Sequence, residues 1–284
     1  MLIAQLTDIH LGFQPDNPSE FNRQRLDDTI DTLLALERKP DLLVATGDLT
    51  DLGTPLSYSQ LAEAFSRLPW PVHLIPGNHD LREPLLAAFP QTKTADGFIQ
   101  YAIDDAGPLR VLMLDTLEDG RHGGGYCETR AAWLDARLSE QPDRPTLLVA
   151  HHPPIQTGIG WMTPGESEPW IERITAVVSR HRNVVRLIAG HIHRSITTAW
   201  AGTAVTVVPS TAPQVALDLR SIGTTPDQRH MIVAEPPAFG LHLWTGRELL
   251  SHLGFGGPMQ VLARYNEGMQ PLVAHLLEEQ GLGH

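Results

Sequence analysis

Histidine is the residue type through which this chain of 284 residues is best equipped to do chemistry. The sequence holds 14 histidines, about one residue in twenty, and a single cysteine. Imidazole nitrogens bind borderline divalent metal ions and exchange protons near neutral pH. Six of the histidines lie, with aspartates and one asparagine, in five short motifs: Asp8-Ile9-His10, Gly47-Asp48, Gly77-Asn78-His79-Asp80, His151-His152 and Gly190-His191-Ile192-His193. These motifs predict metal-assisted or acid–base chemistry.

Each motif directly follows a short apolar run that predicts a buried β-strand. In open α/β sheets, ligands bind beyond the carboxyl ends of the strands, so motifs at several strand ends are expected to converge on one site. Because side chains alternate along an extended segment, Asp8 and His10 are expected to point the same way and to share one metal ion. Taken alone, most of these motifs are more typical of a solvated turn, where Gly and Asp are common. Five of them together at strand ends favour the site.

The residue types also narrow the choice of metal. Carboxylates, imidazoles and one amide oxygen suit Zn, Mn, Fe or Co, while the single Cys127 excludes a thiolate cluster. A carboxylate can bridge two ions, and two ions about 3.5–4 Å apart form the usual clamp for in-line attack on phosphorus. With two ligand aspartates and a bridging hydroxide, the centre keeps a charge of roughly +1, which attracts a phosphate ester. The sequence therefore predicts two divalent metal ions per chain.

The elements that must position these residues alternate in the pattern of an α/β protein. Seven apolar runs predict strands, most of them buried on both faces: 2–7, 42–46, 72–75, 109–114, 146–150, 184–189 and 204–208. Amphipathic spacing predicts helices near 26–34, 55–68, 130–138 and 170–181. The first of these helices is expected to stop at Pro40. The second begins with Thr54 as its N-cap and Pro55 at its first position.

Beyond residue 210 the alternation of predicted strands and helices becomes irregular, and Pro and Gly become frequent. We therefore expect a catalytic domain over residues 1–210 and a smaller C-terminal extension over residues 211–284. Within the extension, the sequence predicts only a strand-like segment at 241–244 and a last helix near 271–279. The extension would serve as a cap over the site or as a contact in a homo-oligomer.

Composition limits the partners of the protein. Lys and Arg number 21 against 33 Asp and Glu, a formal net charge of −12. A nucleic-acid polymer is therefore disfavoured as a substrate, because non-specific binding to it needs a basic surface. No apolar run approaches the eighteen or so residues that cross a bilayer, and the first residues lack a signal-peptide pattern. We expect a cytoplasmic protein with neither a membrane nor a nucleic-acid partner.

The ordered set of motifs resembles the signature of the calcineurin-like metallophosphoesterases over residues 2–210. The resemblance implies a four-layer α/β/β/α sandwich with a dinuclear metal centre between strand-end loops. It also implies the metal ligands by position. One ion would be held by Asp8, His10, Asp48 and His193, and the other by Asp48, Asn78, His151 and His191. Asp48 would bridge the two ions, and His152 would be a neighbour of the centre rather than a ligand.

The same resemblance implies a catalytic role for His79. In the family, the histidine of the Gly-Asn-His motif lies beside the metal ions without binding them. A carboxylate three residues after the bridging aspartate, here Asp51, orients it. Such a pair could stabilise developing charge or protonate the leaving oxygen; alternatively, His79 is only a passive donor to the phosphate. Leu52 stands where protein phosphatases of the family carry arginine, which disfavours a phosphoprotein substrate.

Within the family, the Asp-x-His start, the His-His-Pro-Pro element at 151–154 and the modest length resemble the class III cyclic-nucleotide and glycerophosphodiester phosphodiesterases. The leading hypothesis is hydrolysis of a small phosphodiester, a 3′,5′-cyclic nucleotide, by in-line attack of a metal-bound hydroxide. A glycerophosphodiesterase or broad organophosphate diesterase is the enzymatic alternative. A metal-binding scaffold for protein interactions is the non-enzymatic one. Phe13, His122 and Trp161 could meet the base or alcohol of a substrate, or simply pack.

Overall fold

Two β-sheets form the centre of the computed structural model, which describes residues 1–15, 17, 19–165 and 167–281. The first sheet has the strand order β13-β12-β1-β2-β3, with bounds β1 Leu2–Leu6, β2 Leu42–Thr46, β3 Val72–Ile75, β12 Ala238–Trp244 and β13 Leu249–Phe255. The second has the order β4-β5-β6-β7-β9-β8, with bounds β4 Tyr101–Ile103, β5 Arg110–Met113, β6 Thr146–Val149, β7 Val184–Ala189, β8 Ile196–Trp200 and β9 Thr203–Val207. A short antiparallel pair stands outside both sheets, β10 Gln214–Val215 and β11 Ile232–Val233.

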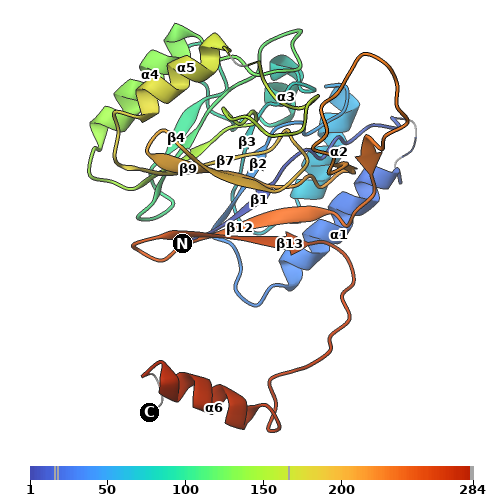
Figure 1. The fold of residues 1–284 in the computed structure, drawn as a ribbon, viewed down its shortest axis with the longest axis vertical. Helices are drawn as coiled ribbons and strands as arrows, with labels where there is room; N and C mark the ends of the chain where they lie inside the picture. Colours follow the sequence, from blue (N-terminus) through green and yellow to red (C-terminus); the bar gives the residue numbers. More distant parts are fainter. Residues whose placement is uncertain (16, 18, 166, 282–284) are drawn as a thin grey trace.

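Helices cover the outer faces of both sheets (Figure 1). One apolar core joins α1 and α2 to the first sheet and also contains inner-face residues of the second sheet, such as Val111 and Leu147. A second core joins α4 and α5 to the other face of the second sheet. The layers therefore run helix, sheet, sheet, helix, which confirms the expected four-layer sandwich. The bounds of the helices in these layers, with α3 beside α2, are α1 Phe21–Ala35, α2 Pro55–Phe65, α3 Arg82–Ala88, α4 Glu128–Glu140 and α5 Pro169–Val178.

The seven predicted strands all form, and β1, β2, β5 and β6 are apolar runs buried on both faces. Thr54 caps α2 as expected, and its hydroxyl accepts the Ser57 backbone N–H at 3.2 Å. Helix α1 ends at Ala35, several residues before the expected stop at Pro40. The sequence did not predict β4, β8, β13 or α3. Strand β4 and helix α3 are short, and most residues of β8 and β13 are not buried, so their apolar patterns are weak.

The expected boundary at residue 210 does not separate the sandwich from an extension. Strand β12 pairs antiparallel with β1, with Leu2 opposite Leu243, and β13 pairs with β12 at the edge of the first sheet. Residues 238–255 are thus part of the first sheet. They looked separate because an antiparallel strand can join a sheet from any distance along the chain, and no local pattern reports its partner.

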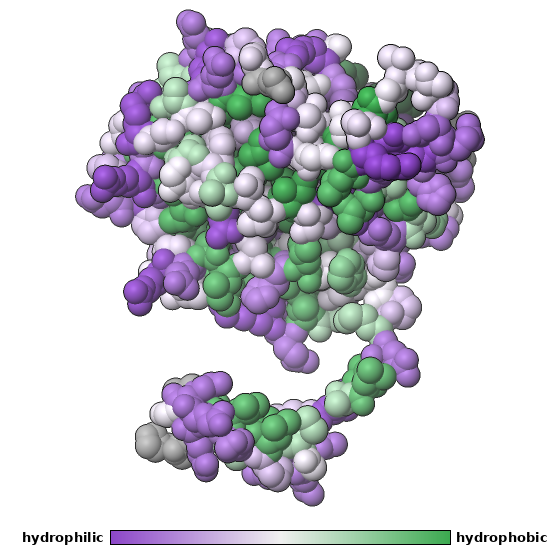
Figure 2. Space-filling view, viewed as in Figure 1, coloured by the Kyte–Doolittle hydropathy of each residue, from purple (hydrophilic) through white to green (hydrophobic). Residues whose placement is uncertain are grey.

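The last described segment leaves the sandwich. Helix α6 (Gln270–Glu279) stands apart from the two sheets in Figure 1 and has no buried residue. Apolar side chains lie exposed along the chain that leads to it, including Leu262 and Met259, and the same region carries green surface in Figure 2. Its role as a cap or an oligomer contact stays a prediction, and residues 282–284 lie outside the described residues. None of the described helices is long and apolar enough to cross a membrane.

Candidate metal centre

The loops that carry the five motifs meet at one edge of the sandwich. They follow β1, β2 and β3 of the first sheet and β6 and β7 of the second, and within each sheet these strands run parallel to one another. Backbone hydrogen bonds tie the loops together: Asp8 N–H donates to the Gly47 carbonyl at 3.0 Å. Across the sheets, the His191 N–H donates to Asp8 Oδ2 at 2.9 Å. The predicted convergence of strand-end residues is therefore present.

The directions of these side chains are set by left-handed backbone conformation and not by alternation along a strand. Strand β1 ends at Leu6, and Asp8 and His10 have φ of 50° and 47°. The expectation that both lie on one face of an extended segment is wrong. Asp48, His191 and His193 also have positive φ. Such values are uncommon in residues other than glycine and persist where surrounding contacts impose them, often at functional sites.

Three glycines leave the space that these side chains occupy. A Cβ on Gly77 would lie 2.2 Å from Asp48 Oδ1, and one on Gly47 would lie 2.5 Å from His151 Nδ1. A Cβ on Gly190 would lie 2.7 Å from Asp8 Oδ2. Each glycine precedes a predicted ligand in sequence and packs against another one in space. These positions therefore require glycine because of a close approach.

Asp80, the last residue of the third motif, holds two of the loops together. Its buried carboxylate accepts the backbone N–H groups of Gly77 at 2.9 Å and Leu49 at 3.0 Å, and the Tyr58 hydroxyl at 2.9 Å. Burial raises the pKa of Asp80, and the negative charge of Asp48 adds to this effect. Asp80 therefore fixes the spacing between the loops that present Asp48 and Asn78.

Four predicted ligands form a first cluster around Asp8. The distance from Asp8 Oδ1 to His193 Nε2 is 3.4 Å, and His10 Nε2 lies 3.7 Å from Asp48 Oδ2. His193 donates from Nδ1 to the Pro213 carbonyl at 2.8 Å, and His10 donates from Nδ1 to a carboxylate at 3.2 Å. Both rings therefore turn the lone pair of Nε2 inward, where the two Nε2 atoms lie only 3.2 Å apart. Two facing lone pairs at this distance need a proton or a metal cation beside them.

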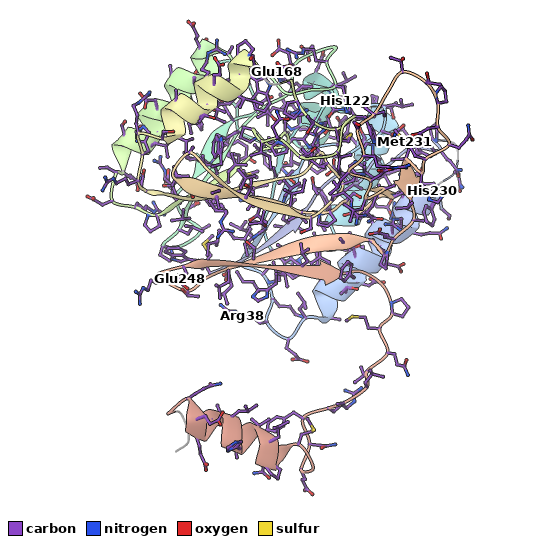
Figure 3. The ribbon with its side chains drawn as sticks, in the orientation of Figure 1. Arg38, His122, Glu168, His230, Met231 and Glu248 are labelled. Atoms are coloured by element: carbon purple, nitrogen blue, oxygen red, sulfur yellow. The ribbon has the colours of Figure 1, made fainter. Side chains whose placement is uncertain are left out.

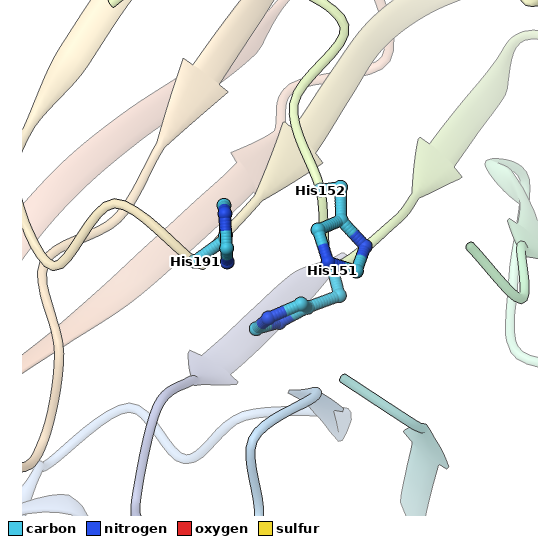
Figure 4. Close-up of side chains that lie close together, drawn as sticks. All are labelled: His151, His152 and His191. Carbon is cyan, nitrogen blue, oxygen red and sulfur yellow. The ribbon is translucent and has the colours of Figure 1, made fainter. Parts of the chain in front are cut away.

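The other predicted ligands form a second cluster that shares Asp48. His151 Nε2 lies 3.4 Å from Asp48 Oδ2 and 3.2 Å from Asn78 Oδ1, while its Nδ1 donates to the Thr46 carbonyl at 2.8 Å. Here too an imidazole Nε2 faces acceptor oxygens, an arrangement that needs a proton or a metal cation between them. His191 lies opposite (Figure 4), with its ring centroid 5.1 Å from that of His151. Its buried Nδ1 has no hydrogen-bond partner among the described residues. These donors fit a second metal ion.

The electrostatics of the two clusters favour a bound cation. Burial alone would raise the pKa values of Asp8 and Asp48, but the adjacent imidazoles, His193 for Asp8 and His151 for Asp48, outweigh it and hold both pKa values low. Burial also opposes a charge on His151, yet Asp48 and Asp8 raise its pKa to about 9. The potential that holds this proton attracts a divalent ion, which displaces the proton on binding. Burial lowers the pKa of His191 well below its usual range, which leaves the neutral ring that a metal requires.

The predicted catalytic pair lies beside the first cluster. The carbonyl of Asp51 accepts from His79 Nδ1 at 2.9 Å, whereas the Asp51 carboxylate lies 3.9 Å from that atom. The same carboxylate lies nearer to His10 Nδ1, at 3.2 Å. Asp51 thus contacts two histidines, one through its backbone and one through its side chain. The His79 ring stands edge-on to His10, with centroids 4.6 Å apart, and its side chain is 37% exposed.

Adjacent histidines after β6 have different surroundings. Both ring nitrogens of His152 contact groups outside the predicted ligand set: Thr116 Oγ1 lies 2.8 Å from Nδ1 and the His122 carbonyl 3.2 Å from Nε2. Figure 4 shows the two rings turned in different directions, at an interplanar angle of 87°. Burial lowers the pKa of His152 well below its usual range. His152 therefore holds the neighbouring loop of His122 through hydrogen bonds and is not itself assigned as a metal ligand.

One residue at the centre was predicted only as an alternative between substrate contact and packing. His122 Nδ1 lies 3.3 Å from Asn78 Nδ2, and its ring centroid lies 4.9 Å from that of His191. His122 is exposed as a whole, but partial desolvation of its ring lowers its pKa. The glycines on both sides of it in the sequence were the available signal of a tight loop. Phe13, another of the three rings considered, is 65% exposed.

Comparisons with known proteins agree with this geometry. The chain is 34% identical over 266 residues to "Probable glycerophosphodiester phosphodiesterase GpdQ" of Arcobacter nitrofigilis, covering 92% of this chain and 95% of that protein. It is 27% identical to "3',5'-cyclic adenosine monophosphate phosphodiesterase CpdA" of Escherichia coli K12, covering 75% and 76%. Its fold is similar to a crystal structure of a dimetal phosphatase from Danio rerio, with a TM-score of 0.59 at 18% identity, covering 88% of this chain and 98% of that chain. The model of the family described as calcineurin-like phosphoesterase matches residues 1–195. The chain therefore belongs to the calcineurin-like phosphoesterase family.

Proposed function

We propose that this protein is a metal-dependent phosphodiesterase with two metal ions per chain and a small phosphodiester as its substrate. The observation that carries the proposal is the pair of inward-facing acceptor clusters that share Asp48. Family membership and relatives whose names describe phosphodiesterases support the same reaction class.

The chain's own residues have separate tasks in this proposal. Asp8, His10 and His193 would hold one ion, and Asn78, His151 and His191 the other, with Asp48 between them. Bound divalent ions would supply Lewis-acid activation of the phosphate and of a water molecule. Zn, Mn, Fe and Co all suit these donors. His79 is placed to hydrogen-bond the phosphate or to give a proton to the leaving oxygen.

A glycerophosphodiester is the substrate that we favour. A pocket of about 210 Å³ opens beside the second cluster, and its lining includes His122, His152, Trp161 and Glu168. His122 and Glu168 are labelled in Figure 3. This volume lies below the roughly 300–1,000 Å³ of pockets that enclose drug-sized ligands, so the pocket suits a small alcohol better than a nucleoside. The relative named as a glycerophosphodiesterase is also matched along nearly its whole length.

A 3′,5′-cyclic nucleotide, the first expectation from the sequence, is the second candidate. The similarity to the relative named CpdA supports it, although that match covers about three quarters of each chain. The net charge of −12 continues to disfavour a polymeric nucleic-acid substrate. Cytoplasmic location and homo-oligomerisation stay predictions.

A substrate panel tests these proposals. The protein loaded with Mn²⁺ would be assayed with glycerophosphoethanolamine, 3′,5′-cyclic AMP, an aryl phosphomonoester and single-stranded DNA at low salt. We expect kcat/KM to favour the diesters over the monoester by at least about tenfold, with the glycerophosphodiester first. A preference for the monoester would overturn the diesterase proposal. A preference for cyclic AMP would overturn only the choice of diester.

A further inference from the structure

We propose that His122, held in place by His152, is a positioning residue that keeps the amide of Asn78 in its metal-binding orientation. The inference rests on the metal centre of the proposed function and goes beyond its ligand set. Neither His122 nor His152 is among the ligands assigned above. Each contributes through a hydrogen bond that determines where another residue's donor atom points.

The first step concerns the two ends of the Asn78 amide. An amide nitrogen donates hydrogen bonds and cannot accept them, whereas its oxygen can bind a metal ion. The nitrogen, Nδ2, lies 3.3 Å from His122 Nδ1, and the oxygen, Oδ1, lies 3.2 Å from His151 Nε2. With Nδ2 donating to His122 Nδ1, the oxygen faces the second cluster. If the amide turned over, its N–H would meet the cluster and oppose a cation.

The second step concerns what holds His122. Its carbonyl accepts a hydrogen bond from His152 Nε2 at 3.2 Å. His152 in turn is fixed at Thr116, whose hydroxyl lies 2.8 Å from Nδ1 and accepts the His152 backbone N–H at 3.2 Å. His152 is 2% exposed, so this anchor belongs to the interior of the sandwich. A continuous series of hydrogen bonds thus runs from Thr116 through His152 and His122 to Asn78.

The third step concerns the loop that carries His122. A Cβ on Gly124 would lie 2.8 Å from the Cβ of His152, so the loop packs directly on that ring. By contrast, a Cβ on Gly123 would meet no atom within 4 Å. The loop therefore packs closely against His152 at Gly124, whereas Gly123 faces open space. This contact places the His122 ring over Asn78.

Metal binding provides a readout that does not depend on catalysis. Partners that orient metal ligands typically contribute tenfold to a hundredfold to metal affinity. Metal-free protein would be titrated with Mn²⁺, and the two binding steps followed by calorimetry and by the EPR signal of the coupled Mn²⁺ pair. We expect His122→Ala to weaken one binding step by at least about tenfold and to leave the other within about threefold. The step that does not change shows that the variant is folded.

Two further variants separate positioning from packing. His122→Asn keeps an acceptor near the place of Nδ1 and should restore most of the lost affinity. In an Asn78→Asp background, either carboxylate oxygen can face the metal, so His122→Ala should then change affinity by less than about threefold. Gly123→Ala is the control in the same loop and should bind both ions like the wild type.

The results that overturn the inference are distinct from those that overturn the proposed function. Wild-type affinity for both ions in His122→Ala refutes it, as does a loss in His122→Asn equal to that in His122→Ala. An equal weakening of both binding steps also refutes it, because the effect would then not be specific to the Asn78 cluster. If the wild type binds two ions but hydrolyses no diester, the proposed function fails while the positioning role of His122 stands.

Discussion

Gly77→Ala adds one methyl group at the most crowded point of the centre. The new Cβ would lie 2.2 Å from Asp48 Oδ1, 2.3 Å from the Asp48 backbone nitrogen and 2.8 Å from His151 Cε1. A flexible side chain could move away, but the backbone nitrogen is held in the loop after β2. We therefore expect the loops presenting Asp48 and Asn78 to be pushed apart.

The expected magnitude has two parts. Overpacking of this kind costs about 1–3 kcal/mol of folding stability, which for a domain of this size lowers Tm by about 2–10 °C. Displacement of the ligands should also weaken metal binding by about tenfold to a hundredfold, which removes a further 1.4–2.7 kcal/mol or so of metal-dependent stabilisation. The variant should therefore lose more stability with Mn²⁺ than with a chelator.

Differential scanning calorimetry with Mn²⁺ and with a chelator measures both parts. Gly223→Ala is the matched control, since a Cβ there meets no atom within 4 Å and its φ is not left-handed. In a loop such a change leaves stability unchanged or raises it by up to about 1 kcal/mol, because alanine restricts the unfolded chain. If Gly77→Ala and Gly223→Ala gave equal Tm values in both conditions, the close approach at Gly77 would not be real.

Three other perturbations test separate parts of the structure. Asp48→Asn removes the carboxylate shared by both clusters. The bound Mn²⁺ measured by atomic absorption should fall, and diester turnover should drop by at least about a hundredfold. Full metal content with full turnover would contradict the bridging role. Asp80→Asn replaces a carboxylate that accepts five hydrogen bonds by an amide whose nitrogen cannot accept, and urea denaturation should show a loss of about 1–3 kcal/mol. His242 is fully buried, and burial, with Arg186 and His252 nearby, lowers its pKa to about 3. Its neutral ring stabilises the fold above the unfolded pKa of about 6.5, and this contribution is lost as pH falls from about 6.5 towards 3, by about 1.4 kcal/mol per unit. Denaturation at pH 6.5 and pH 5 should therefore show about 2 kcal/mol more loss in the wild type than in His242→Gln; equal losses would contradict the buried neutral state.

Much of the sandwich was predictable because its strands are continuous apolar runs. Both faces of β1, β2 and β6 are buried, so each strand shows up in the sequence without knowledge of its neighbours. Strands β12 and β13 were harder, because their apolar residues are interrupted by glycine and polar residues and because β12 joins the sheet by pairing with β1 from the other end of the chain. The domain boundary placed at residue 210 failed for this reason.

The chemistry of the centre was evident from the sequence itself, because ligand chemistry depends on residue type and on position after a strand. Asp, His and Asn at five strand ends were sufficient to predict a dinuclear centre. The family resemblance already favoured His151 over His152 as a ligand, and the tertiary structure gives the physical reason, since each ring nitrogen takes its role from a partner at least 30 residues away. Only the tertiary structure shows the left-handed backbone that aims Asp8 and His10, and the contact between His122 and Asn78. Residue types determine which atoms can bind a metal ion, whereas folding determines which of those atoms remain free to do so.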